Sequence, residues 1–225
     1  PLRQIAEITS LLGAPYLNTF GSTETGIPPA TASMLPIGKV PGSLAKEQSS
    51  FCEVRLVDED DNDVADGEPG ELLTRGPTLF SAYWADEGAT EHAFRDNWYH
   101  MGDVCRRTED GRFEFIDRRK YLIKSGGENI YPAEIEHVVL ADPRIIDAAV
   151  VRRRNERWGE VPVLFVASDD PHLREAELLA LCREKMAGYK IPKAVHFISE
   201  DEFPRTSTGK IERQALEERL ASTPD

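Results

Sequence analysis

The chain lacks the sequence features of membrane-spanning, secreted and disulfide-bonded proteins. Among its 225 residues no apolar run approaches the ~18 residues needed to cross a bilayer, and the first residues lack the basic flank and apolar block of a signal peptide. Its three cysteines, Cys52, Cys105 and Cys182, are odd in number, far apart and in no CxxC pair. We therefore expect neither disulfides nor a zinc site, but idle thiols in the reducing cytoplasm.

The chain also carries no excess of positive charge. Its net charge is −13, with 9 basic and 21 acidic side chains in residues 1–117, and 18 basic and 19 acidic ones in residues 118–225. Nucleic-acid binding needs basic stripes that replace counterions, so we expect no such partner. Two short basic clusters, Arg118–Lys120 and Arg152–Arg154, would suit a small polyphosphate ligand, although most such clusters are solvated surface.

Short strands and turns dominate the first half of the chain. Alternating apolar residues predict strands, and a 3.6-residue period predicts helices. The predicted elements are helices over 2–12 and 87–94 and strands over 14–20, 51–57, 70–75, 99–106 and 112–116. Residues 26–50 are rich in proline, glycine and serine and are predicted to be mostly loop. Strands and turns at this spacing predict a small β-barrel or a distorted sheet.

After Asp117 strands and helices alternate. The predicted strands cover 121–123, 146–151, 161–167 and 194–198, and the predicted helices cover 132–140, 175–186 and a last segment to about 220. This order predicts a small α+β domain. With 40% apolar and 30% charged residues, the chain has the composition of a soluble globular protein with one large or two small domains. We place the domain boundary at Asp117.

The run Pro204–Arg213 presents a lysine in a loop. Its Thr, Ser and Gly residues cannot hold a packed helix, and Ile211 and Ala215 begin a helical period that would fix the base of the loop. Lys210 could then deliver one positive charge to an oxyanion or a phosphate. The run alone is equally compatible with a solvated Gly-Lys turn. It is not a Walker loop, because no glycine lies five residues before Gly209 and Ile211 replaces the required Ser or Thr.

Eight motifs occur together in one order along the chain. They are Phe20–Glu24, Gly70–Leu72, Tyr99–Asp103, Asp117–Lys120, Ser125–Glu136, Arg157–Gly159, Tyr189–Pro192 and Pro204–Arg213. The series resembles the adenylate-forming, AMP-binding superfamily, and within it the C-terminal portion of the acyl-CoA synthetases. The string Lys124–Ile130 is similar to that of CoA ligases for fatty or aryl acids, whereas peptide-synthetase adenylation domains tend to have a different string there.

The resemblance implies an α+β fold in two parts. Residues 1–117 would be the end of the large AMP-binding N-terminal domain, with a β-barrel-like subdomain, and residues 118–225 a mobile lid domain with its hinge at Asp117. The glycine-rich phosphate loop of the family is absent from the sequence, so we expect the chain to be a fragment that is inactive or nearly inactive alone. The motif Gly70–Leu72 is predicted to be architectural.

The resemblance also implies a nucleotide and metal site. Its members would be Phe20, Gly21, Ser22, Thr23, Glu24, Asp103 and Arg118. In this site Glu24 would hold Mg²⁺ and Thr23 would contact the α-phosphate, although a Thr-Glu pair alone is more often a helix N-terminal feature. Phe20 stands where the family usually has tyrosine, and its ring can still stack on adenine. Asp103 would accept hydrogen bonds from both ribose hydroxyls, with Arg118 near the ribose and phosphate.

A second set of residues resembles the CoA site of the family. Its members would be Ser125, Gly126, Gly127, Trp158, Tyr189 and Lys193. Without Cβ atoms, Gly126 and Gly127 would leave room for the thin thiol arm of CoA, although the pair also suits a plain turn. Trp158 is equally consistent with a cover over a strand end, and Lys193 with plain surface. Lys210 matches the lysine that bridges the substrate carboxylate and the α-phosphate.

The reaction implied for the parent enzyme has two steps. A carboxylic acid and ATP give an acyl-adenylate and pyrophosphate, and the CoA thiol then gives acyl-CoA and AMP, with lid rotation between the steps. One alternative is an adenylation module that serves a carrier protein, and another is a non-catalytic nucleotide-binding fragment. A homodimer, and a protein lysine acetyltransferase that would remove the charge of Lys210, are further partners we consider.

Overall fold

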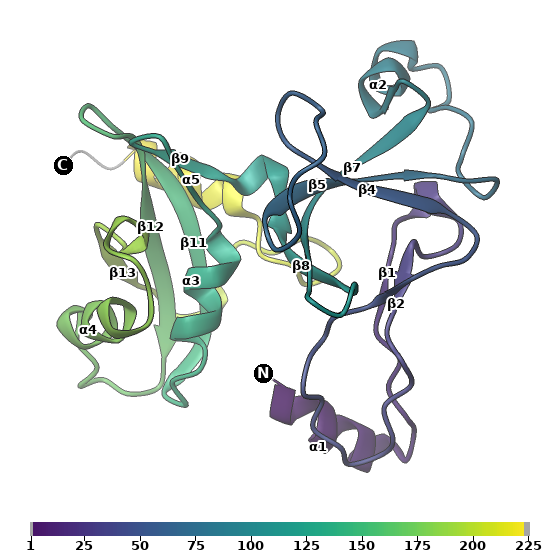
Figure 1. Cartoon of the computed structure of the whole chain (residues 1–225). Helices are drawn as coiled ribbons and strands as arrows, with labels where there is room; N and C mark the ends of the chain where they lie inside the picture. The colour runs from purple at the N-terminus through teal and green to yellow at the C-terminus, as the bar shows by residue number, and fades with distance from the viewer. Residues whose placement is uncertain (1, 223–225) are drawn as a thin grey trace. The chain divides into compact units, whose positions relative to one another are not determined.

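The chain divides into two compact units between Arg119 and Lys120. A computed structural model describes residues 2–222, and Figure 1 shows its helices and strands. The boundary that the sequence predicts, at Asp117, lies two residues earlier, inside strand β8 (Phe113–Arg118) of the first unit. Hinge motion at Asp117 stays a prediction.

The first unit begins with helix α1 (Leu2–Leu12), which confirms the predicted helix. Three two-residue strands, β1 (Thr19–Phe20), β2 (Ala30–Thr31) and β3 (Glu47–Gln48), form a small antiparallel sheet. The predicted strand over 14–20 is therefore shortened to its last two residues. Directly after β1 the chain turns through the 3₁₀ helix η1 (Thr23–Thr25).

A five-stranded antiparallel sheet forms the core of the first unit. Its strands β4 (Glu53–Val57), β5 (Pro69–Arg75), β7 (Trp98–Arg107) and β6 (Phe94–Arg95) lie in that order, and β8 pairs with β7. Helix α2 (Glu87–Ala93) begins at Asp86, whose carboxylate accepts the N–H of Ala89. The predicted strands and the hairpin between β7 and β8 are confirmed. Buried Leu72, Tyr99 and Phe113 pack together within this sheet.

A bulge interrupts the ladder between β5 and β7. Leu73 pairs with His100 and Glu71 pairs with Val104, so the three residues between His100 and Val104 oppose a single residue of β5. At its centre Gly102 has a φ of +69°, a left-handed conformation that glycine adopts readily. Bulges of this kind bend a strand and redirect its side chains. Asp103 follows Gly102 directly in this bulge.

The second unit is an α+β domain, as predicted. Its sheet has the order β10 (Glu128–Ile130), β9 (Ile123–Ser125), β12 (Gly159–Ser168) and β11 (Ile145–Asn155), and β13 (Val195–Phe197) runs parallel to β12. Its helices are α3 (Pro132–Val139), α4 (Glu175–Lys185) and α5 (Arg213–Ser222), and the 3₁₀ helices are η3 (Gly188–Lys190) and η4 (Glu200–Glu202).

One predicted strand of this unit, over 121–123, begins two residues later than predicted. Residues 119–121 form the 3₁₀ helix η2 (Arg119–Tyr121), and the strand starts only at Ile123. A physical reason is the packing of Tyr121, whose ring centre lies 4.9 Å from the Lys120 amine and 4.5 Å from the Arg213 guanidinium. These cation–π contacts hold the ring in a turn, where a ladder position would point it elsewhere.

Strand β12 is buried on both faces. On one side its Leu164 and Val166 pack with Ile135 of α3 and Leu178 of α4. On the other side Val163 and Phe165 pack in the cluster that contains Leu216 of α5. Coverage of both faces explains why its sequence is a continuous apolar run without alternation.

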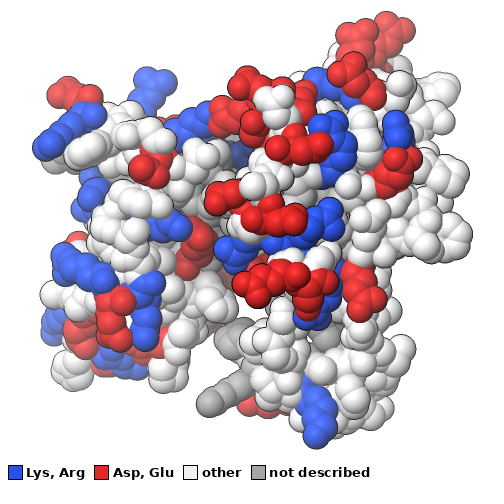
Figure 2. Space-filling model, in the orientation of Figure 1, with Lys and Arg blue, Asp and Glu red and all other residues white. Residues whose placement is uncertain are grey.

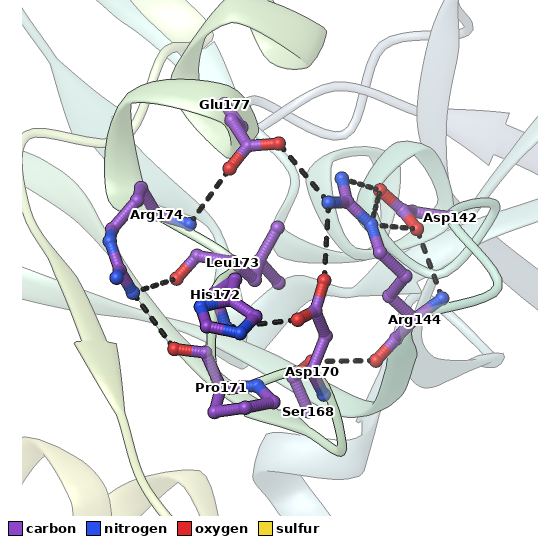
Figure 3. A network of polar contacts seen from close by, with 9 residues as sticks. All are labelled: Asp142, Arg144, Ser168, Asp170, Pro171, His172, Leu173, Arg174 and Glu177. Carbon is purple, nitrogen blue, oxygen red and sulfur yellow. Dashed lines mark hydrogen bonds and ion pairs between the residues drawn. The ribbon is translucent and has the colours of Figure 1, made fainter.

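A polar cluster ties two loops of this unit together (Figure 3). The guanidinium of Arg144 lies 2.8 Å from Asp142, 3.1 Å from Glu177 at the start of α4 and 3.5 Å from Asp170. The backbone carbonyl of Arg144 accepts a hydrogen bond of 2.7 Å from the Ser168 hydroxyl. Arg144 thus links the loop before β11 to the segment between β12 and α4.

The face of the molecule drawn in Figure 2 carries both signs of charge, with acidic side chains beside basic ones. Exposed ion pairs of the chain include Arg75 with Glu53 and Arg106 with Glu114, each at 2.6 Å. Within residues 2–222 no helix has the length and apolar character needed to cross a membrane.

The Arg144 cluster makes a prediction about stability and pH. Its hydrogen bonds lower the pKa of Asp142, so their stabilisation is present above the unfolded pKa of ~4 and is lost as pH falls through the folded pKa. We expect Arg144→Met to lower the midpoint of urea denaturation at pH 7 and to have a smaller effect near pH 3.

Lys185→Met is the matched control, since the amine of Lys185 forms its ion pair with the exposed neighbouring residue Glu184, at 3.1 Å. It should leave both midpoints nearly unchanged. An equal loss for Arg144→Met at neutral and acidic pH would contradict the assignment to Asp142.

Candidate functional site

The turn Gly21–Thr25 presents two side chains that the sequence assigns to the nucleotide site. Its geometry is fixed by Thr25, whose hydroxyl accepts the N–H of Ser22 at 3.1 Å and donates to the Ser22 carbonyl at 2.9 Å. Gly21 suits this turn because a Cβ there would lie in tight contact, 3.1 Å from the Cα of Pro28. The turn leaves Thr23 exposed and Glu24 half-buried.

Glu24 accepts two hydrogen bonds from the segment that follows β5. The Tyr83 hydroxyl donates to Glu24 Oε1 at 3.0 Å, and the N–H of Phe80 donates to the Glu24 carbonyl at 2.9 Å. The Ser22 side chain, the Tyr83 hydroxyl and the positive charge of Arg118 all lower the pKa of Glu24. Glu24 is therefore an ionised carboxylate at neutral pH, and the charge of Arg118 acts on it.

Asp103 and Arg118, both assigned to the nucleotide site, lie directly opposite each other on β7 and β8. Arg118 Nε lies 2.6 Å from Asp103 Oδ1. The Asp103 side chain is only 5% exposed, whereas that of Arg118 is 46% exposed. The structure thus brings these two residues together, with the cation at the surface and the carboxylate beneath it.

Phe20 and Asp117 both make contacts within the first unit that do not involve a ligand. The ring of Phe20 packs against Phe115 with a centroid distance of 5.9 Å, and it joins the apolar cluster of the sheet. Asp117 is buried in β8, where its carboxylate accepts the N–H of Arg118 at 2.7 Å. Stacking of Phe20 on adenine stays a prediction.

Lys210 lies in the second unit, exposed near the end of a hairpin turn. Thr206 donates its N–H to the Lys210 carbonyl at 2.8 Å, and Gly209 has a φ of +82°. Two ion pairs fix the ends of the loop, Arg205 with Asp147 at 2.5 Å and Arg213 with Glu136 at 2.7 Å. The loop with a fixed base is what the sequence indicates, while the chemical role of Lys210 stays a prediction.

The glycine pair of the second unit is only partly open. Gly126 and Gly127 form the left-handed turn between β9 and β10, with φ values of +61° and +90°. A Cβ on Gly126 would lie 2.6 Å from the Trp158 ring, whereas a Cβ on Gly127 would meet nothing within 4 Å. The idea that both glycines leave free space is therefore corrected. Gly126 makes room for Trp158, and only Gly127 faces open space.

The remaining residues of the predicted CoA site surround this turn in different ways. Ser125 is buried and pairs with Gly159 across β9 and β12. Tyr189 is 39% exposed in η3, an element that packs against β10. Lys193 is exposed, and its backbone N–H donates to Pro162 at 2.9 Å. Their contacts with CoA stay predictions.

The sequence analysis missed Tyr83 and gave Glu71 no part in the site. Tyr83 lies in an irregular segment, and its one available signal is the cluster of aromatic residues around it, in which Phe80 packs 4.8 Å from its ring. Glu71 was interpreted as architectural. Its carboxylate is buried beside Gly102, immediately before Asp103.

Two family models match the chain. The AMP-binding enzyme model covers residues 2–84, and the model of the AMP-binding enzyme C-terminal domain covers residues 134–210. The chain belongs to the AMP-binding enzyme family. This confirms the resemblance found in the motifs, and both matches include residues of the candidate site, since Glu24 lies in the first and Lys210 in the second.

Curated relatives are acid–CoA ligases. The chain is 36% identical over 227 residues to a long-chain-fatty-acid–CoA ligase of Escherichia coli O157:H7, covering 100% of this chain and 40% of the relative. It is 38% identical over 222 residues to an indoleacetate–CoA ligase of Aromatoleum aromaticum, covering 98% of this chain and 43% of the relative. The chain thus spans well under half the length of these relatives.

A solved relative is the o-succinylbenzoate CoA synthetase of Bacillus subtilis in complex with its acyl-adenylate intermediate. It matches with a TM-score of 0.79 and 32% identity over 96% of this chain and 43% of its own. The same synthetase has been solved with ATP and a magnesium ion, at a TM-score of 0.78 and 31% identity over 94% of this chain and 43% of its own. The mixed α+β fold is therefore that of an adenylate-forming CoA synthetase.

The contact between Tyr83 and Glu24 gives a prediction for the chain itself. A hydroxyl that donates to a carboxylate stabilises its ionised form, so Tyr83→Phe should raise the pKa of Glu24. Titration of the Glu24 carboxyl carbon by NMR would measure this. The matched control is Tyr189→Phe, which removes an exposed hydroxyl from the second unit and should leave the Glu24 titration unchanged. The same Glu24 pKa in Tyr83→Phe and the wild type would contradict the role of Tyr83.

Proposed function

We propose that the protein to which this chain belongs is an AMP-forming acid–CoA ligase. It would join a carboxylic acid to AMP with release of pyrophosphate, and then transfer the acyl group to CoA. The observation that carries the proposal is the pairing of Asp103 with Arg118 at 2.6 Å, within reach of the charge of Glu24. Residues far apart in the sequence thus form one polar site in a family that binds AMP.

The residues of this site fit a nucleotide. The buried Asp103 carboxylate can accept hydrogen bonds from two ribose hydroxyls, and a site of that kind favours ligands that carry both. The Arg118 guanidinium is exposed enough to turn toward a phosphate, to which it can donate more than one hydrogen bond. Phe20 and Thr23 complete the proposed contacts, to adenine and to the α-phosphate.

A magnesium ion fits the same residues. Mg²⁺ is usually bound by one or two carboxylates together with water and substrate phosphates, so Glu24 alone is a sufficient protein ligand. Within residues 2–222 no cluster of three or more His, Cys, Asp or Glu side chains could hold a metal by itself. When bound, the ion would neutralise charge on the phosphates of ATP.

The second unit would supply the groups that differ between the two half-reactions. Lys210 would neutralise the negative charge that builds up when the substrate carboxylate attacks the α-phosphate. The open turn at Gly127, beside Trp158 and near Tyr189, would receive CoA in the second half-reaction. Movement between the two states would take place near Asp117, close to the division at Arg119 and Lys120.

The relatives name fatty and aromatic acids as substrates, which favours an acid of one of these kinds. We infer that the 225 residues alone do not complete the reaction, since the family's glycine-rich phosphate loop is not among them.

One experiment tests the proposed function directly. The full-length protein should release AMP from ATP only with Mg²⁺, an acid of the fatty or aromatic class and free CoA, with acyl-CoA as the product. A module that serves a carrier protein would give pyrophosphate exchange but ignore free CoA. AMP formation that proceeds without any acid, or none under all conditions, would count against the proposal.

Lys210 gives a second prediction for the full-length enzyme. Lys210→Ala should slow acid-dependent pyrophosphate exchange by about 10²-fold, the scale for loss of one preorganised charge-stabilising donor. The second half-reaction, started from the preformed acyl-adenylate and CoA, should change much less. Lys185→Ala is the matched control, because it also removes an exposed lysine from the second unit and has no assigned role in the site. Unchanged pyrophosphate exchange in Lys210→Ala would contradict the assigned role.

A further inference from the structure

Glu71 is a buried carboxylate outside the set of residues assigned to the nucleotide. It lies on β5 with a relative exposure of 6%. A carboxylate buried to this extent needs hydrogen-bond donors or positive charge around it, and each of its neighbours is therefore informative. Two of its neighbours, Gly102 and Arg119, flank the residues of the Asp103–Arg118 pair.

The first neighbour is the bulge of β7. The N–H of Gly102 donates to Glu71 Oε1 at 3.1 Å. Since Gly102 lies inside the bulge, with no partner in the register of β5, the Glu71 side chain replaces the missing ladder contact. An unmade hydrogen bond at a partly buried amide is costly, so this contact stabilises the bulged conformation of the segment before Asp103.

The second neighbour comes directly after Arg118. The Arg119 guanidinium forms an ion pair and hydrogen bond with Glu71 Oε2. The same oxygen lies 3.3 Å from His100 Nδ1, which in turn lies 2.6 Å from Arg95. Burial opposes the ionisation of Glu71, but the contacts with His100 and Arg119 outweigh it and lower its pKa. Glu71 is thus ionised, and its ion pair with Arg119 connects it to the residue directly after β8.

The Glu71 side chain therefore contacts both β7 and the residue that follows β8. Gly102 precedes Asp103 and Arg119 follows Arg118, and each is fixed by a different oxygen of Glu71. Because Asp103 and Arg118 are also cross-strand partners, a shift of either flank would change where their side chains point. The contacts of Glu71 thus hold the residue before Asp103 and the residue after Arg118 in place.

We propose that Glu71 is a positioning residue that aims Asp103 and Arg118 at the ribose of the nucleotide, with Arg119 as its partner. This inference rests on the proposed function, since it concerns the same site. It assigns to Glu71 and Arg119 an effect on ligand preference, in addition to any effect on folding.

The test compares nucleotides that differ only in the ribose. Calorimetric titration of the full-length protein with AMP, 2′-deoxy-AMP and 3′-deoxy-AMP measures the preference for each hydroxyl. In the wild type AMP should bind more tightly than either deoxy analogue. Glu71→Gln, which removes the charge but keeps the shape, should reduce this preference by about tenfold, the scale of one hydrogen bond to a charged group. Arg119→Met should act in the same direction.

Two features keep the test decisive. Arg119 has a side-chain exposure of 37%, and Glu71 keeps its contacts with Gly102 and His100 in Arg119→Met, so we expect this variant to fold even if Glu71→Gln unfolds; thermal unfolding checks this. Glu53→Gln is the matched control, because it removes an exposed carboxylate paired with Arg75 on the same sheet. It should leave the ribose preference unchanged.

The outcomes separate the two proposals. A wild type that does not bind AMP would overturn both the proposed function and this inference. A wild type that prefers AMP, together with a folded Arg119→Met protein whose preference is unaltered, would overturn the inference alone. An equal drop in affinity for all three nucleotides would also overturn it, because that is the effect of a merely structural role.

Discussion

The proposed site depends on the cross-strand pairing of Asp103 with Arg118, directly after the bulge in β7. A regular ladder would place alternate side chains on the two faces of the sheet, whereas the bulge adds residues on one strand and redirects the side chains after them. Glycine at position 102 permits the left-handed backbone conformation that the bulge contains. Together they place a nearly buried carboxylate beneath an exposed guanidinium.

The second unit supports the exposed groups that we assign to catalysis and CoA binding. Lys210 and the Gly126–Gly127 turn both lie in loops; the turn joins β9 to β10, and ion pairs with Asp147 of β11 and Glu136 of α3 hold the ends of the Lys210 loop. The central strand of the sheet, β12, is covered by α3 and α4 on one face and by α5 on the other. Exposed loops on a rigid core are the usual arrangement for groups that act on a ligand.

The sequence predicts local structure well where periodicity is strong. Helix α1, the β7–β8 hairpin and strands β11 and β12 follow from apolar patterns and turn residues. It fails where long-range packing decides. The strand predicted to begin at residue 121 begins at Ile123, after a turn in which Tyr121 packs against Arg213, a residue 92 positions away in the chain.

The candidate site shows the same division. Glu24, Asp103 and Arg118 are readable from motifs, because their residue types and order carry the resemblance. The contacts that hold them are not readable, since Tyr83 and Glu71 reach them through the fold. The glycine pair is an intermediate case. The sequence shows the glycine at position 126, but the ring of Trp158 that leaves no room for a Cβ there is visible only in the structure.

The most direct measurement is a crystal structure of the full-length protein with AMP bound. The account predicts that the Asp103 carboxylate accepts hydrogen bonds from the ribose hydroxyls, with Arg118 beside the ribose and phosphate and Glu71 still bonded to the N–H of Gly102. A nucleotide bound with its ribose away from Asp103 would contradict it.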